Sequence, residues 1–124
     1  MGSAVCQTRV DLYRSGGGND PALRKVRPEK EYIRDHQGNN VVRPGMGLST
    51  FTSRTTHGGK WWRLPAGSPI PVGLRFTNDH DDHYLIEPVE TILVDDYINL
   101  VIQTSSYWEK VLDEQDGLVS KERS

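Results

Sequence analysis

Residues 41–51 read VVRPGMGLSTF, which places one proline and two glycines directly before a short run that carries two hydroxyl groups. Gly45 and Gly47 can take a positive φ and let another backbone or a ligand come close. The four residues Leu48 to Phe51 have the content of a β-strand. The stretch therefore predicts a loop that leads into a strand at the edge of a cleft. A ligand site and a simple turn both explain it, and turns are the commoner case.

Short alternating segments separated by turn residues continue in both directions along the chain. Val10 to Arg14 alternates apolar and polar side chains and stops at SGGGNDP, so Arg14 falls at the end of a strand. Residues 35–39 have the composition of a hairpin loop, and residues 77–82 that of a charged turn. The predicted strands are 10–14, 31–34, 40–43, 48–51, 60–64, 72–76 and 83–87.

Helical signals are concentrated near the C-terminal end. Apolar residues recur at spacings of three and four between residues 94 and 101, which predicts an amphipathic helix. A second helix is predicted to begin at Ser106, because Glu109 follows at the spacing of a capping box. Residues 22–27 are long enough for one helical turn only. Strands, proline-rich connections and terminal helices together predict a mixed α+β domain.

The length of 124 residues supports one compact domain with one core. We expect a single domain over residues 1–124, with its core at about 10–112 and a frayed tail at 113–124. A formal charge of −2, from 15 basic and 17 acidic side chains, gives no general sign of a nucleic-acid partner. Adjacent tryptophans at 61 and 62 must face opposite sides of a sheet.

Cellular location is constrained by the cysteine count and the first residues. Cys6 is the single cysteine, so it forms no internal disulfide, which fits a reducing compartment. The opening MGSAVCQTRV has neither the basic nor the apolar region of a signal peptide, and no apolar run is long enough to cross a bilayer. We expect a cytoplasmic protein with no membrane partner, delivered, if it is exported, by a route that needs no signal peptide.

Residues 79–83 read DHDDH and are dense in carboxylates and imidazoles. His80 and His83 are three residues apart, which would suit a metal ion on a helix, but the flanking Asn78 and the aspartates favour a hydrated turn. Because such matches are often accidental, we expect no metal ion here.

Two further groups of side chains are candidates for a binding site. His83 and Glu87 fall on the same face of one strand, which suits either a cleft or a half-exposed edge strand. The guanidinium of Arg14 suits phosphate, and the hydroxyls of Ser49 and Thr50 suit ribose. A surface arginine and locally bonded hydroxyls explain the second group equally well.

The order of four segments resembles a known family. LYR at 12–14, RPGMGLSTF at 43–51, KWWRLPAGSPIPVGL at 60–74 and HYLIEP at 83–88, followed by a helix, are similar to the small ADP-ribosyltransferase-like toxins of type VI secretion, the type six exported effector two family. The resemblance spans about residues 10–112. It implies an α+β fold with a split antiparallel β-sheet and with peripheral and C-terminal helices.

The same resemblance implies NAD as substrate and a role for each candidate. It places Arg14 at the NAD phosphate or ribose, has Ser49 and Thr50 organise the nicotinamide-ribose side, and makes His83 and Glu87 catalytic. The usual Glu-x-Glu pair is replaced by Glu87 and Glu90, which are three residues apart. Transfer of ADP-ribose, NAD hydrolysis as a glycohydrolase, and an inactive fold therefore all stay open.

The implied biology is that of a toxin in the cytosol of a target cell. It would modify an unknown acceptor macromolecule, and a protective immunity protein would bind over or beside the cleft, with Trp61 or Trp62 as an aromatic anchor. The alternative is a non-catalytic or RNA-directed binding module on the same fold, which a basic rim around the cleft would favour.

Overall fold

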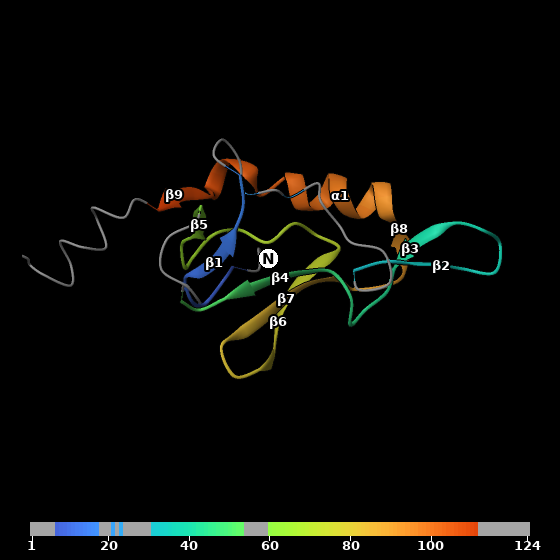
Figure 1. Cartoon of the computed structure of the whole chain (residues 1–124), viewed down its shortest axis with the longest axis horizontal. Helices are drawn as coiled ribbons and strands as arrows, with labels where there is room; N and C mark the ends of the chain where they lie inside the picture. Colours follow the sequence, from blue (N-terminus) through green and yellow to red (C-terminus); the bar gives the residue numbers. More distant parts are fainter. Residues whose placement is uncertain (1–6, 18–20, 22, 24–30, 54–59, 112–124) are drawn as a thin grey trace, which may run out of the picture.

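The computed structural model describes residues 7–17, 21, 23, 31–53 and 60–111, and Figure 1 shows their arrangement. The described part contains short strands, one α-helix and one turn of 3₁₀ helix. The strands are β1 (Leu12–Ser15), β2 (Ile33–Arg34), β3 (Asn40–Val42), β4 (Leu48–Phe51), β5 (Trp61–Leu64), β6 (Leu74–His80), β7 (His83–Pro88), β8 (Ile92–Leu93) and β9 (Glu109–Val111). The helices are α1 (Val94–Ile102) and the 3₁₀ turn η1 (Ser105–Tyr107).

The strands form two antiparallel sheets, which confirms the predicted α+β class and the split sheet. The larger sheet has the order β6-β7-β4-β1-β5-β9, and the smaller has the order β2-β3-β8. In Figure 1, α1 runs along the larger sheet with the smaller sheet at one end of it. The smaller sheet and α1 are directly continuous in sequence, because β8 ends at Leu93 and α1 begins at Val94.

The hydrophobic core lies between one face of the larger sheet and α1. Alternation along each strand sends every second side chain to this face, which we call the core face. Its fully buried members from the sheet pack with Tyr97 and Val101 of α1, the two residues that give this helix its buried stripe. The sheet residues in this cluster are Leu12, Leu48, Leu64, Leu74 and Ile86.

Tyr97 joins α1 to the middle of the larger sheet by two hydrogen bonds. Its hydroxyl donates to the Ile86 carbonyl at 2.5 Å and accepts from the Leu48 amide at 2.9 Å. Leu48 and Ile86 face each other across β4 and β7, so the hydroxyl bridges the backbones of a cross-strand pair. Burial raises the pKa of Tyr97 far above its ordinary value, which keeps the hydroxyl neutral and able to donate.

Gly47 provides the space for this bridge. It has φ 136°, and a Cβ atom at this position would lie 2.0 Å from the Ile86 oxygen and 2.7 Å from the Tyr97 hydroxyl. A side chain here is therefore incompatible with the Tyr97 bridge. The close approach that the sequence predicted at this glycine is made by the protein's own strand β7.

Most predicted elements are confirmed with small shifts, but the C-terminal one is wrong. Within the described residues, Ser106 and Tyr107 form the end of η1, and Glu109–Val111 form β9 in place of a second α-helix. The open edge of β5 accounts for the difference, because Glu109–Val111 pairs with it and the Glu109 carboxylate accepts from Arg63 at 2.6 Å. Pairing across a sheet outweighed a local capping pattern.

The charged turn predicted at residues 77–82 is also shorter than expected. Strand β6 continues through His80, so only Asp81 and Asp82 form the turn between β6 and β7. Asp81 adopts φ 43°, a left-handed conformation that aspartate tolerates in tight turns. Pairing with β7 therefore makes residues 77–80 part of a strand, although their polar composition predicted a turn.

The remaining predictions concern residues outside the described ranges and the two adjacent tryptophans. The helical turn at 22–27 and the tail at 113–124 lie outside the described residues. Trp61 is buried, 4% exposed, so it does not offer the exposed aromatic anchor expected for a partner protein. Trp62 is half-buried, and its ring nitrogen donates to the Gly17 carbonyl at 2.9 Å.

We predict that Tyr97→Phe lowers the free energy of unfolding by about 1–3 kcal/mol, because it leaves a buried amide and a buried carbonyl without their partner. Urea denaturation measures the change. Tyr107→Phe is the matched control, since that tyrosine is 43% exposed and its loss of a hydroxyl should cost little. Equal effects of the two substitutions would contradict the bridging role.

Candidate functional site

The three strands that carry the predicted site residues are neighbours in the middle of the larger sheet. Their order is β7-β4-β1, with His83 and Glu87 on β7, Ser49 and Thr50 on β4, and Arg14 on β1. Arg14 and Glu87 are 73 positions apart in the sequence, and the sheet brings their strands close together. The predicted grouping of three strands is thus present in the structure.

The register divides the five side chains between the two faces of the sheet. Ser49 pairs with Leu85, while Phe51 pairs with both His83 and Tyr13. Side chains directly opposite each other share a face, so Ser49, His83 and Glu87 lie on one face, which we call the outer face. Arg14 and Thr50 lie on the core face. The single cleft that the sequence predicted for all five side chains is therefore wrong.

Arg14 contacts β4 through the backbone. Its guanidinium donates from Nη1 to the Ser49 carbonyl at 3.1 Å and from Nε to the Pro21 carbonyl at 2.9 Å. The charges of Arg14 and of the buried Glu31 both act on the Tyr97 hydroxyl, Arg14 lowering and Glu31 raising its pKa. Arg14 therefore holds the strand that carries Ser49 from the side opposite the Ser49 hydroxyl.

Ser49 and Thr50 have different environments because they point in opposite directions. The Thr50 side chain is fully buried, and its hydroxyl donates to the Tyr84 carbonyl of β7 at 3.0 Å. Ser49 is only half-buried. The outer-face hydroxyl can reach a ligand, whereas the core-face hydroxyl stabilises the pairing of β4 with β7.

Glu87 is buried and fully engaged. Its carboxylate accepts from the Gly45 amide at 2.6 Å and forms an ion pair with Arg75, with 3.2 Å between Nε and Oε2. Burial alone would raise the pKa of Glu87, but the hydrogen bonds from Thr77, Arg75 and Gly45 outweigh it and hold the pKa below its ordinary value. Glu87 is thus an ionised group that fixes the glycine-rich loop to the sheet.

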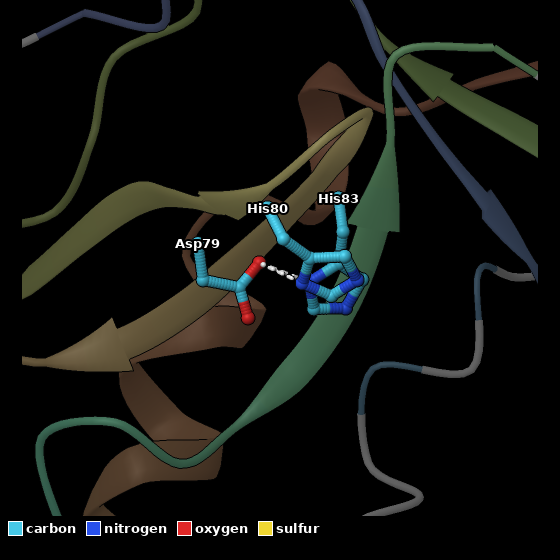
Figure 2. Close-up of side chains that lie close together, drawn as sticks. All are labelled: Asp79, His80 and His83. Carbon is cyan, nitrogen blue, oxygen red and sulfur yellow. Dashed lines mark hydrogen bonds and ion pairs between the residues drawn. The ribbon is translucent and has the colours of Figure 1, made fainter.

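His83 is held by an acidic neighbour at the tip of the β6–β7 hairpin. Figure 2 shows the Asp79 carboxylate pointing at the rings of His80 and His83, and it is in hydrogen-bond contact with Nδ1 of His83. Burial alone would raise the pKa of Asp79, but the hydrogen bond and the charge of His83 outweigh it. The pKa of Asp79 therefore lies below its ordinary value, and the carboxyl group is ionised. In the neutral form of an imidazole, a ring that donates from Nδ1 to a carboxylate has Nε2 as its acceptor.

His83 and Glu87 are too far apart to act on one atom. Both lie on the outer face, but four residues of strand separate them by about 13 Å, at about 3.3 Å per residue. Leu85 lies between them and pairs with Ser49. A ligand held by Ser49 can meet His83 or Glu87 at its reacting bond, but not both.

A separate cavity of about 580 Å³ opens beside the core face. None of the five predicted site residues lines it, although two of its residues, Leu12 and Tyr84, are their neighbours on β1 and β7. It carries the charged groups of Arg9 and Arg75 and the rings of Phe76 and Tyr84. The site predicted from the sequence and the described cavity therefore lie at different places.

Two residues important for the site were not identified from the sequence. Tyr97 had a recognisable signal, because a hydroxyl in the apolar stripe of a helix needs a buried partner. Arg75 had none, because its partner depends on an irregularity of β6 between Asn78 and His80. Asp79 belongs to the DHDDH stretch that the sequence singled out, but its contact with His83 depends on the same irregularity.

We predict that Glu87→Gln lowers the free energy of unfolding by about 1 kcal/mol at neutral pH, because it removes the charge that Arg75 pairs with. The folded pKa is depressed, so this stability is present above the ordinary value near 4.5 and is lost as the pH falls through the folded pKa. Urea denaturation at several pH values should therefore show the two proteins converging in acid. Glu90→Gln, at an exposed position, should show no such gap.

Comparison with known proteins gives one positive result. No curated protein and no solved structure matches the chain. No helix in the described ranges is long and apolar enough to cross a membrane. One family model, described as Tse2 ADP-ribosyltransferase toxin, matches residues 8–110, which include every strand and helix described above except the last residue of β9. The chain therefore belongs to the family of Tse2 ADP-ribosyltransferase toxins.

Proposed function

We propose that this toxin uses NAD as substrate and acts in the cytosol of a target cell. It breaks the bond between nicotinamide and ribose and transfers ADP-ribose to an acceptor macromolecule. The observation that carries the proposal is the contact from Arg14 to the Ser49 carbonyl, together with the strand order β7-β4-β1. This order unites the arginine, hydroxyl and histidine elements that the resemblance assigns to NAD.

The reaction requires a site that stabilises the positive charge that develops on the ribose. Cleavage of the nicotinamide-ribose bond passes through an oxocarbenium-like transition state. Hydrogen bonds that hold the ribose in place lower the activation barrier to this state. We place the Ser49 hydroxyl at the ribose and the His83 imidazole beside it on the outer face. Arg14 and Thr50 act from the core face by fixing β4, through the bonds from Arg14 to the Ser49 carbonyl and from Thr50 to the Tyr84 carbonyl.

Glu87 has a supporting role in this proposal. Its carboxylate is occupied by Arg75 and by the Gly45 amide, and it lies about 13 Å along the strand from His83. An imidazole gives weaker electrostatic stabilisation than a carboxylate, so the reaction should be slow for an enzyme of this class. Glu87 contributes by holding the loop that leads into β4.

The charge around His83 favours NAD over RNA as the bound molecule. Asp79, Asp81 and Asp82 are all exposed at the hairpin tip next to it. A polyanion such as RNA is bound mainly through basic groups that neutralise its phosphates, and three neighbouring carboxylates oppose this. The RNA-directed alternative is therefore the weaker one.

An immunity protein is the partner that a toxin of this kind requires in the cell that makes it. We propose that it binds over the outer face, where it would cover Ser49 and His83. Half-buried Phe51 and Tyr13 belong to the same face and supply aromatic surface for such a contact. Trp61 is excluded from this role by its burial.

The proposal is tested with chain made by cell-free synthesis, which avoids toxicity to a host. The chain is incubated with NAD labelled in its adenylate phosphate and with a cell lysate, in the presence of a chelator. We predict release of nicotinamide together with transfer of label to a macromolecule. Release without transfer would identify a glycohydrolase. The absence of both release and transfer would overturn the proposal.

Ser49→Ala should lower the rate of nicotinamide release about tenfold or more, because a hydrogen bond to a developing charge is worth about 1.5–3 kcal/mol. Its free energy of unfolding should not change. Ser53→Ala, two residues beyond β4 at an exposed position, is the control that keeps full activity. Full activity of Ser49→Ala would contradict the placement of NAD on the outer face.

His83→Asn should lower kcat about a hundredfold while NAD affinity changes little, because a positioned acid or base contributes to the transition state and not to binding. His36→Asn, at an exposed position in the loop between β2 and β3, is the control and should keep full activity. If kcat for His83→Asn equals that of the wild type, the catalytic assignment of β7 fails and a binding module becomes the better explanation.

A further inference from the structure

The tip of the β6–β7 hairpin contains a β-bulge that changes which side chains meet. Asn78 pairs with Tyr84, but His80 pairs with His83, so β6 has one residue more than β7 over this interval. Asp79 is the extra residue. In such a bulge two residues of one strand oppose a single residue of the other, and the extra side chain is re-aimed. Asp79 and His80 therefore both lie against His83.

The three side chains converge to within the size of a small coordination site. One oxygen or nitrogen from each of Asp79, His80 and His83 lies within 4.8 Å of the others. The Asp79 Oδ1 atom is 3.2 Å from Nδ1 of His80 and is in hydrogen-bond contact with Nδ1 of His83. The two rings are stacked, with centroids 4.7 Å apart and planes 19° apart, and Figure 2 shows both at the same carboxylate.

The backbone around these side chains is fixed without them. The Asn78 side-chain amide donates to the carbonyls of Asp81 and His83, each at 2.9 Å. These bonds tie the two strands together across the turn. On the other side of His83, the Phe51 ring makes an edge contact with its ring at 5.3 Å between centroids. The ligand atoms are therefore held close together before any ion arrives.

We propose that Asp79, His80 and His83 bind one divalent transition-metal ion of the Zn²⁺ type. Two imidazoles and one carboxylate are the donor set that zinc accepts, and calcium or magnesium would require oxygen ligands instead. Ligands of one tetrahedral zinc ion, bound at about 2.0–2.2 Å, lie about 3.3 Å apart, which is close to the 3.2 Å between Asp79 Oδ1 and Nδ1 of His80. The proposal reverses the expectation of a hydrated turn.

The protons balance in a simple way. Binding through Nδ1 displaces the proton that His83 shares with Asp79, and this proton moves to Nε2 of the same ring, so the imidazole stays neutral. The His80 ring binds as its Nε2–H tautomer. Because the His80 side chain is 65% exposed and that of Asp79 is 39% exposed, water completes the coordination of the ion. The neighbouring carboxylates of Asp81 and Asp82 add attraction for a cation.

The test measures metal binding to the full chain, prepared without a histidine tag and stripped with a chelator that is then removed. Isothermal titration with ZnCl₂ should show one ion per chain, and Co²⁺ should give the visible absorption bands of a bound ion. Asp79→Asn and His80→Asn should each weaken Zn²⁺ binding about tenfold or more, since even outer contacts of a metal site cost that much. His36→Asn, in the loop between β2 and β3, should bind as the wild type does.

Circular dichroism of each variant establishes that the fold is intact before titration. Absence of stoichiometric Zn²⁺ binding by the folded wild type, or equal binding by His80→Asn, would overturn the proposal and leave an ion-paired hairpin only. The measurement contains neither NAD nor an acceptor. Its failure would therefore leave the proposed NAD chemistry untouched. The two proposals share His83, but the NAD assay contains a chelator and so tests the metal-free protein.

Discussion

The hydroxyl of Tyr97 is the contact on which the arrangement of the protein depends. It bonds to one backbone group on β4 and one on β7, so it fastens α1 to two neighbouring strands of the larger sheet. Because α1 follows directly from β8, the same contact also sets where the smaller sheet lies. A buried hydroxyl with two backbone partners is costly to disrupt, since each partner would then be left unsatisfied. The bridge admits no Cβ at Gly47, which makes that glycine a requirement of the fold.

The loop before β4 is fixed at both ends by this arrangement. Gly47 lies against the Tyr97 bridge, and the Gly45 amide donates to the Glu87 carboxylate. Strand β4 therefore enters the sheet in one register, and the period of two then decides that Ser49 faces outward and Thr50 inward. A Ser-Thr pair on a strand cannot give both hydroxyls to a ligand. One serves the ligand, and the other supports the strand that presents it.

The sequence predicted what depends on local pattern and missed what depends on pairing. The helix containing Tyr97, the strand at Leu48 to Phe51 and the shared face of His83 and Glu87 all follow from periodicity, and the structure has them. The face occupied by Arg14 depends on its register against β4, which no spacing reveals. Residues 109–111 carry a helical capping pattern, yet the free edge of β5 makes them a strand. Family motifs located the central strands but not which side each residue takes.

The bulge at Asp79 shows how one residue determines several contacts. Without it, a two-residue turn at Asp81 and Asp82 would place Phe76 opposite Glu87, since each further pair moves one residue along both strands. With it, the register shifts by one, so Arg75 lies opposite Glu87 and Phe76 lies opposite Ile86 on the core face. The extra residue thus gives Glu87 its cation, gives the core an aromatic ring, and leaves its own carboxylate against two histidines. The chemistry at the hairpin tip and the support of the glycine-rich loop have the same structural origin.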